Sequence, residues 1–352
     1  MRLKLFSLLF AGCSTLISYV HASPLDQATP VRSLKPYHTV YQFPGTAWIE
    51  SIAVRWNGDL LVTLVDRPEL YLIDPQSRRP PILLYTFPHV TALLGIDEVG
   101  PDEFAVVAGN WSIPTFSTTP GSYSIWTATF KSPHSNAVRL RRAAPIPEAN
   151  FLNGVATLDP AAGLILVGDA GAGLVYRVNV HTGAYTVVLQ DDASMGTYPV
   201  GSTHSGINGV KVHDGYAYYT NTARGLFSRV RINTRTGTAT GPYQILTSPG
   251  AMDDFAFAPK KERPGHHSGE DWVVYSTGHA NNILLKITPD GQFSTVFGSP
   301  NSTVLEGDTA CAFGRTKRDS DVLYVVTDGG LAHPLDGFVQ GGEVIAISVD
   351  KL

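Results

Sequence analysis

Asn208-Gly-Val-Lys-Val-His-Asp-Gly-Tyr216-Ala-Tyr-Tyr-Thr220 shows the pattern from which the fold of this chain can be predicted. A polar residue precedes a short apolar run, a turn and a second hydrophobic strand. The pattern returns about every 44 to 59 residues, a spacing typical of propeller blades made of several short strands. The copies indicate an all-β chain folded as a six-bladed β-propeller with a central pocket. They open at Glu50, Leu94, Asn153, Asn208, Asp253 and Thr309.

The radial repeat also predicts how the ring closes. A strand at residues 37–43 precedes the first copy, and we expect it to pair with the strand near residues 342–348. That pairing would leave no long sheet edge exposed. The outer strands of successive blades are predicted at residues 70–74, 175–179, 228–233 and 284–288, each followed by a turn signal.

The N-terminal residues have the pattern of a targeting signal rather than that of a folded domain. Basic residues 1–4, an apolar run and small residues before Ser23 are typical of a secretory signal peptide at residues 1–22. Polar, proline-containing residues 23–36 indicate a tether, and residues 37–352 form the propeller. We therefore expect a secreted or secretory-pathway protein, in which the sequons at Asn110 and Asn301 would be glycosylation sites.

Composition excludes several classes of partner. Charged residues make up 16% of the chain and the net charge is −4, which gives no electrostatic basis for binding nucleic acid or a membrane surface. No glycine-rich phosphate loop or Gly-x-Ser-x-Gly elbow is present, so we expect no nucleotide cofactor and no serine hydrolase. Cys311 is predicted to be a buried structural thiol, and a closed ring predicts a monomer.

Hard oxygen donors lead the inner strands of four copies. Because the copies share one phase, propeller symmetry gathers these side chains around the central axis. Two carboxylates and two amides suit one divalent cation, Ca²⁺, Mg²⁺ or Zn²⁺ held by oxygen. An alternative is that Asn-Gly and Asp-Asp are only turn residues at strand starts. The candidate metal ligands are Glu50, Asn153, Asn208 and either Asp253 or Asp254.

The mouth of the pocket is predicted to be apolar. Two long loops, residues 109–124 and 190–207, supply aromatic residues, and long loops on a rigid scaffold often build binding sites. Such a mouth favours a small hydrophobic substrate over a sugar. Core packing is the alternative for Trp48 and Phe151. The candidate substrate contacts are Trp48, Trp111, Phe116, Phe151, Met252 and His279.

Acid–base candidates follow from the same placement. His204 lies four residues before Asn208 in an entry loop and titrates near neutrality, so it is the first choice. Surface exposure is the alternative for a lone loop histidine. The other candidates for proton transfer are Tyr198, His279 and the pair Glu50 and Asp254.

The phrases Asn153-Gly-Val-Ala, Asn208-Gly-Val and Asp253-Asp-Phe-Ala-Phe-Ala-Pro resemble the senescence-marker/gluconolactonase group of propellers. The resemblance implies one divalent cation at the axis, below a small-molecule pocket. It implies that Glu50, Asn153 and Asp253 or Asp254 are ligands and that Asn208 is the remaining asparagine. In lactonases of that group the metal polarises the ester carbonyl and an acidic ligand assists proton transfer. This chain departs from them at Leu94 and in its aromatic mouth.

A secreted, aromatic-lined propeller also resembles the fungal hetero-Diels–Alderases of tropolone–terpenoid biosynthesis. That resemblance implies cycloaddition of a quinone methide to a cyclic terpene alkene, as a step of specialised metabolism. The reaction requires near-attack geometry and a hydrogen-bond donor rather than a nucleophile. We therefore expect a hetero-Diels–Alder-type cyclase, with a metal-dependent lactonase and a non-catalytic binding propeller as alternatives.

Overall fold

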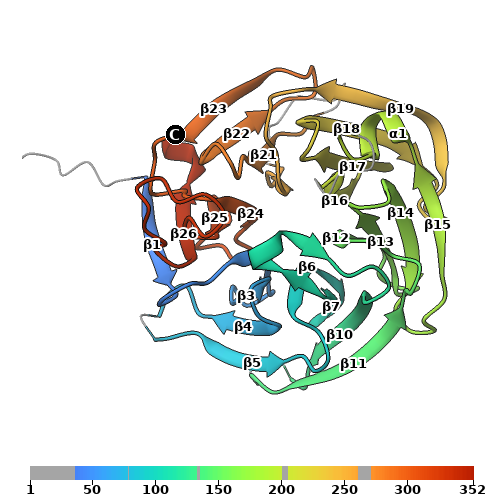
Figure 1. Cartoon of the computed structure of the whole chain (residues 1–352), viewed down its shortest axis with the longest axis horizontal. Helices are drawn as coiled ribbons and strands as arrows, with labels where there is room; N and C mark the ends of the chain where they lie inside the picture. The colour runs from blue at the N-terminus through green and yellow to red at the C-terminus, as the bar shows by residue number, and fades with distance from the viewer. Residues whose placement is uncertain (1–35, 78, 133–134, 200–204, 261–270) are drawn as a thin grey trace, which may run out of the picture. The chain divides into compact units, whose positions relative to one another are not determined.

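The computed structural model describes residues 36–77, 79–132, 135–199, 205–260 and 271–352. Within residues 36–352, six four-stranded antiparallel sheets surround a central axis (Figure 1), which confirms the predicted six-bladed propeller. The predicted signal peptide and most of the tether lie outside the described residues. In the described part of the chain, no helix is long and apolar enough to cross a membrane.

Each blade runs from an inner strand at the axis to an outer strand at the rim. Blade 1 contains β2 (Ile49–Val54), β3 (Leu60–Leu64), β4 (Glu69–Ile73) and β5 (Ile82–Thr86), and blade 2 contains β6 (Ala92–Gly100), β7 (Glu103–Gly109), β10 (Ser124–Phe130) and β11 (Val138–Pro145). Blade 3 contains β12 (Leu152–Asp159), β13 (Leu164–Asp169), β14 (Leu174–Asn179) and β15 (Tyr185–Gln190). Blade 4 contains β16 (Ile207–His213), β17 (Tyr216–Asn221), β18 (Leu226–Ile232) and β19 (Ala239–Thr247).

Blade 5 contains β20 (Phe255–Phe257), β21 (Val274–Thr277), β22 (Ile283–Ile287) and β23 (Phe293–Gly298), and blade 6 contains β24 (Asp308–Phe313), β25 (Val322–Thr327), β26 (Glu343–Ser348) and β1 (Tyr37–Gln42). β1 pairs antiparallel with β26, with Tyr37 opposite Ile347, so the predicted closure is confirmed. The segments predicted as outer strands are instead the third strands β4, β14, β18 and β22. The outermost strands carry weaker apolar patterns because both of their faces are partly solvated.

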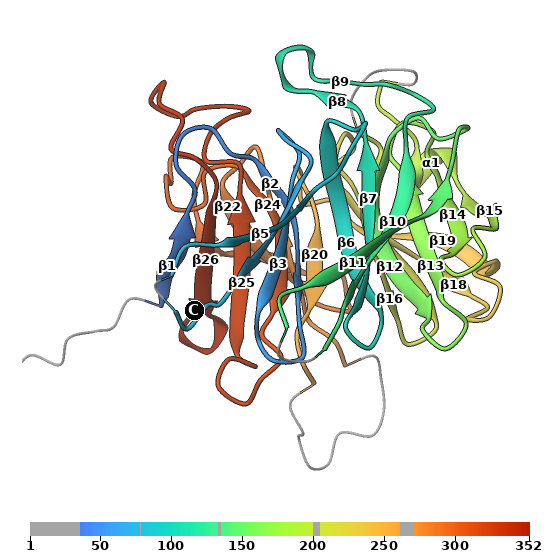
Figure 2. The ribbon, with the colours of Figure 1, turned by 90° about the horizontal axis from the view of Figure 1, so that it is seen from below.

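Short elements decorate the ring. Figure 2 shows the hairpin of β8 (Trp111–Ser112) and β9 (Ser117–Thr118) rising from one face, which we call the upper face. The 3₁₀ turn η1 (Ile113–Thr115) joins these two strands. The single-turn helix α1 (Asp192–Met195) follows blade 3, and η2 (Val349–Lys351) ends the chain.

The hydrophobic core is divided among the blade junctions. Among the described residues, six clusters of buried apolar side chains each combine strands of neighbouring blades. Neither face of a single sheet could be buried without its neighbours, so burial of apolar surface between blades stabilises the ring as a whole.

Glycines let the inner strands approach closely at the axis. A Cβ on Gly154 would stand 2.1 Å from the carbonyl oxygen of Asn208, and one on Gly95 would stand 2.4 Å from that of Asn153. A Cβ on Gly209 would stand 2.4 Å from Oδ1 and 2.9 Å from the Cα of Asp254. The glycine of each Asn-Gly pair therefore lies inside a strand and permits close packing of backbones, which corrects the turn interpretation.

Candidate functional site

A cavity of about 660 Å³ opens on the upper face of the ring, at the axis. Inner-strand residues form its floor, and the turns between second and third strands form its rim. The lining residues are Trp48, Glu50, Val65, Trp111, Phe116, Phe151, Asn153, Tyr198, Pro199, Ser205, Asn208, Thr222, Ala223, Ala251, Asp253, His279, Ala280, Ala332 and His333.

Two carboxyl–amide pairs form the polar floor. Glu50 is hydrogen-bonded to Asn153, and the indole Nε1 of Trp48 donates to its Oε2 at 2.8 Å. Asp253 is hydrogen-bonded to Asn208. Asn208 also donates from Nδ2 to Thr222 Oγ1 at 2.9 Å. Each pair thus joins side chains from different blades, so the floor forms only when the ring closes.

Burial makes both floor carboxyls weak acids. Burial raises the pKa of Glu50 above its ordinary value, although His279 and the hydrogen bond from Trp48 oppose that effect. Burial raises the pKa of Asp253 well above its ordinary value, and repulsion from Glu50 adds to the rise. The neutral form of Asp253 is therefore more accessible than that of an exposed aspartate, and in that form its carboxyl is a hydrogen-bond donor at the floor.

His279 lies beside these carboxyls in the β21–β22 turn. Its Nε2 is 3.2 Å from Oδ2 of Asp328, which is fully buried. Burial alone would lower the pKa of His279, but the hydrogen bond to Asp328 and the charges of Asp253 and Glu50 outweigh burial and raise it to about 9. At neutral pH the ring is an imidazolium. In the described part of the chain Nδ1 has no protein partner, so it is the nitrogen left to donate to a ligand.

Backbone amides fix Asp328. Its Oδ1 accepts from the amide of Gly330 at 2.7 Å, and its Oδ2 accepts from that of Ala332 at 3.1 Å. The same carboxylate therefore shapes the β25–β26 loop, which brings Ala332 and His333 to the cavity, and orients His279.

Aromatic rings form much of the wall. Trp111 stacks on Phe151 with ring centroids 5.0 Å apart and planes 9° apart. Phe116 lies edge-on to Trp111 at 6.3 Å, and Trp48 lies 5.5 Å from the ring of His279. Such rings offer flat apolar contacts to a ligand. They also place the imidazolium next to an aromatic face, where a delocalised substrate would lie.

The structure separates two predicted residues from this site. Asp254 does not line the cavity, because its carboxylate accepts from Lys211 Nζ at 2.9 Å toward the lower end of the axis. Met252 is fully buried in the core between blades 4 and 5. His204 lies outside the described residues. Cys311 is a buried free thiol that donates to the carbonyl of Tyr275 at 3.4 Å, and burial raises its pKa well above the ordinary value.

The other predicted side chains come together in the cavity. The structure adds polar residues that were not among the predicted site residues: Ser205, Thr222 and His333 line the cavity, and Asp328 contacts it through His279. The sequence contains a signal for Asp328. Asp66, Asp169 and Asn221 occupy the same phase, at or just after the end of a second strand, and each accepts a hydrogen bond from the main chain of a nearby loop.

The floor donors fit a hard divalent cation by their chemistry. Two carboxyls and two amide oxygens are typical ligands of Ca²⁺ or Mg²⁺, and a cation would offset the unfavourable burial of two acids. In the described residues, no cluster of three or more His, Cys, Asp and Glu side chains could hold a metal, so the amides of Asn153 and Asn208 would have to contribute.

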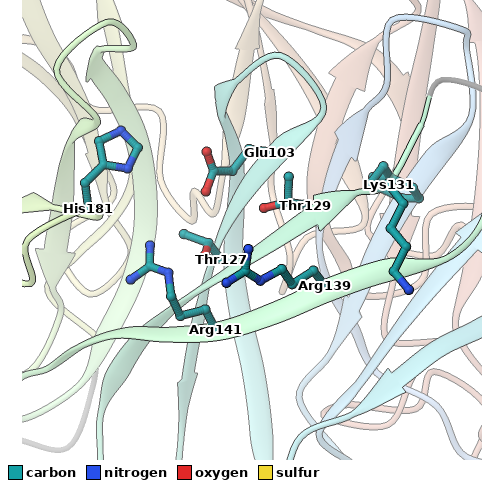
Figure 3. Close-up of a pocket in the computed structure, with 8 residues that line it drawn as sticks. Glu103, Thr127, Thr129, Lys131, Arg139, Arg141 and His181 are labelled. Atoms are coloured by element: carbon teal, nitrogen blue, oxygen red, sulfur yellow. The ribbon is translucent and has the colours of Figure 1, made fainter.

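A smaller pocket of about 300 Å³ lies on the outer strands of blade 2 (Figure 3). Arg139 and Arg141 of β11 extend toward Thr127 and Glu103 there. Arg141 donates to the carbonyl of Val180 at 2.6 Å. None of the predicted site residues lines this pocket, which adjoins the end of β7 opposite to Trp111.

Comparisons with solved structures support the architecture. The calcium-binding protein regucalcin of Agrobacterium tumefaciens aligns with a TM-score of 0.58 and 16% identity over 88% of this chain and 92% of that one. A luciferin-regenerating enzyme aligns with a TM-score of 0.60 and 15% identity over 89% and 94%. These similarities show the fold. No family model matches the chain.

Sequence comparison identifies nearer relatives. A protein of a Phoma species, named as a hetero-Diels-Alderase, is 30% identical over 319 residues, which are 82% of this chain and 86% of the relative. A second protein with that name, from Sarocladium schorii, is 29% identical over 341 residues, or 90% and 83%. Both resemblances inferred from the sequence are confirmed. Because the sequence relatives are named as enzymes, catalysis is favoured over a purely binding propeller, and the substrate is a small molecule. The chain belongs to the family of six-bladed propeller enzymes named as hetero-Diels-Alderases.

Proposed function

We propose that this enzyme joins a quinone methide to an alkene by hetero-Diels–Alder cycloaddition in its axial cavity. The observation that carries the proposal is that aromatic walls enclose a cavity in which the imidazolium of His279 lies beside the floor carboxyls. Cycloaddition requires two apolar partners held in near-attack geometry, and rigid aromatic walls supply that. It forms one C–O and one C–C bond with no loss of atoms, so no nucleophile is required.

His279 is the residue that we assign to the heterodiene carbonyl. Charge develops on that oxygen as the alkene adds, and a donor already oriented by Asp328 stabilises it without reorganisation. The hydrogen bond lies in a largely apolar cavity, where it is stronger than in water. The walls also exclude water, which would otherwise add to the quinone methide.

The floor carboxyls suit the step that generates the quinone methide. A hydroxymethyl phenol loses water when its C–O bond breaks and its phenolic proton departs. In its neutral form the carboxyl of Asp253 donates to the leaving hydroxyl, and Glu50, when ionised, accepts the phenolic proton. When a divalent cation is bound by the floor donors, it supplies Lewis-acid polarisation of an oxygen.

The test uses the purified enzyme with an o-hydroxymethyl phenol and a cyclic terpene triene. We expect one stereoisomeric adduct, measured by chiral chromatography, and a rate at least about 100-fold lower for His279→Gln. His181→Gln is the matched control, because His181 is exposed on the outside of the ring. An adduct with the same isomer ratio as the protein-free reaction would refute the proposal.

A second candidate is metal-dependent lactone hydrolysis, favoured by the oxygen-donor set of the floor. It predicts opening of simple aldonolactones that EDTA abolishes and that Asn153→Ala also abolishes. Lactone opening that survives both treatments would exclude this candidate. Cycloaddition and hydrolysis are separated by running both substrate sets on one preparation.

Secretion is proposed on the sequence of residues 1–22. Asn301 is exposed, whereas Asn110 is half-buried with its Oδ1 shielded from solvent, so a glycan would be carried at Asn301. Mass spectrometry of protein from the culture medium would show an N-terminus near Ser23 and one glycosylated site. Retention of residues 1–22 inside the cell would contradict this proposal.

A further inference from the structure

Arg224, in the β17–β18 turn, has an unusual set of partners. Its Nε donates to the carbonyl of Gly196 at 3.3 Å, and its Nη2 donates to that of Thr197 at 3.4 Å. Its guanidinium carbon lies 5.1 Å from the centroid of the Tyr198 ring. Among the residues that the structure describes, no carboxylate pairs with this cation. In the described part of the chain, the guanidinium therefore contacts only residues 196–198, and Tyr198 of this segment lines the cavity.

The same turn holds the preceding residues from beneath. Asn221, which is fully buried, donates from Nδ2 to the carbonyls of Ser194 at 3.0 Å and Gly196 at 2.9 Å. Its Oδ1 accepts from the amide of Arg224 at 3.0 Å. Blade 4 therefore fixes the backbone up to Thr197 by hydrogen bonds, whereas at Tyr198 it is the guanidinium that lies over the ring.

Tyr198 lines the cavity although 56% of its surface is exposed. A tyrosine with that exposure would normally sample several rotamers, which costs free energy when a ligand fixes one of them. A planar guanidinium over the ring face restrains it, because arginine stacks on aromatic rings and lysine cannot reproduce that geometry.

We propose that Arg224 is a specificity-determining positioning residue, which holds the Tyr198 ring across the mouth so that the cavity selects flat, apolar substrates. The inference deepens the proposed cycloaddition and rests on it only for the identity of the substrate. Arg224 acts through Tyr198 and does not line the cavity itself. The proposal predicts that changes at Arg224 and at Tyr198 have non-independent effects on ligand binding, without any reaction taking place.

The experiment measures binding of the neutral aromatic probe N-phenyl-1-naphthylamine by energy transfer from tryptophan. The variants are Arg224→Met, Arg224→Lys, Tyr198→Ala, Tyr198→Phe and the double variant Arg224→Met/Tyr198→Ala. Arg231→Met is the matched control, because Arg231 is exposed on β18 of the same blade. Thermal unfolding of each variant separates loss of structure from loss of positioning.

We expect Arg224→Met and Tyr198→Ala each to weaken probe binding at least about fivefold, and the double variant to equal Tyr198→Ala. Arg224→Lys recovers part of the loss, and Tyr198→Phe and Arg231→Met bind like the wild type. Multiplicative effects in the double variant, or wild-type binding by Arg224→Met, would overturn the proposal. Because the probe does not react, failure of the cycloaddition assay leaves this result interpretable.

Discussion

Replacing Asp328 by asparagine should lower the pKa of His279 and move the pH at which the enzyme loses activity. Asp328 is the group whose hydrogen bond contributes most to raising that pKa, and its charge adds to the effect. Asparagine keeps the shape of the side chain and removes the charge. Burial, which alone lowers the pKa, would then be opposed by the charges of Asp253 and Glu50.

The magnitude follows from the two end states. The pKa of His279 is raised from 6.5 to about 9, so at pH 7.5 about 97% of the rings carry a charge. A fall to about 6.5 would leave about 9% charged at the same pH. Because the donor is the protonated ring, activity is present below the pKa and lost above it. The variant should therefore lose about tenfold at pH 7.5 and recover as the pH falls toward 5.5.

Nuclear magnetic resonance of protein labelled in its histidines follows the ring directly. The signal absent from His279→Gln identifies the residue, and its chemical shift against pH gives the pKa. Asp336→Asn is the matched control, because Asp336 is an exposed acid on the same loop that accepts only from the amide of Phe338. The reasoning is refuted when His279 titrates at the same pH in Asp328→Asn and in the wild type.

Two further predictions concern the scaffold. Gly154→Ala forces a Cβ to 2.1 Å from a backbone oxygen of the next blade, so we expect a loss of about 3 kcal/mol or more in chemical denaturation. Gly241→Ala meets its nearest neighbour at 3.4 Å and should change stability by less than about 0.5 kcal/mol, and equal losses would contradict this account. Arg55→Met breaks a buried pair with Asp102, whose carboxylate oxygens lie 2.9 and 2.7 Å from the guanidinium nitrogens. The free energy of unfolding at pH 7 should fall by about 3–5 kcal/mol. Arg139→Met is the control and should change it little, because Arg139 is exposed. Burial alone would raise the pKa of Asp102, but the hydrogen bonds from Arg55 and Trp56 and the charge of Arg55 together outweigh it and lower the pKa. The cost should therefore shrink as the pH falls below about 4, and a cost independent of pH would count against the assignment.

The blade count and the meeting of Glu50, Asn153 and Asn208 at one floor could be predicted from the sequence because both depend on periodicity. A repeat fixes the position of a residue within its blade, and symmetry then fixes its neighbours across the axis. The identity of a fourth strand is harder to predict. β5 and β15 are exposed on both faces and carry little of the alternation that marks a strand half-buried in a sheet.

Contacts that connect different repeat positions could not be predicted in this way. The pairing of His279 with Asp328 joins a turn of blade 5 to a second-strand end of blade 6. Asp66 and Asp169 occupy the equivalent position and accept from main-chain amides, and Asp66 also pairs with the adjacent Arg67. The shared phase therefore reports loop support, and only blade 6 combines it with a histidine within reach. The pairing of His279 with Asp328 depends on a difference between the copies of the repeat. An argument that treats the copies as equivalent does not reveal that difference.

The choice between Asp253 and Asp254 shows the same limit at the scale of one residue. Successive side chains of an extended segment point to opposite sides. A shift of one position therefore moves a side chain from the cavity to the lower end of the axis. Alignment of the repeats left that shift open, because both residues are aspartate. Lys211 decides it, because its ammonium holds Asp254 at 2.9 Å below and leaves Asp253 to face the cavity beside Asn208. The neighbouring acids consequently differ in surroundings: burial at the cavity floor raises the pKa of Asp253, whereas Asp254 pairs with a lysine of the adjacent blade.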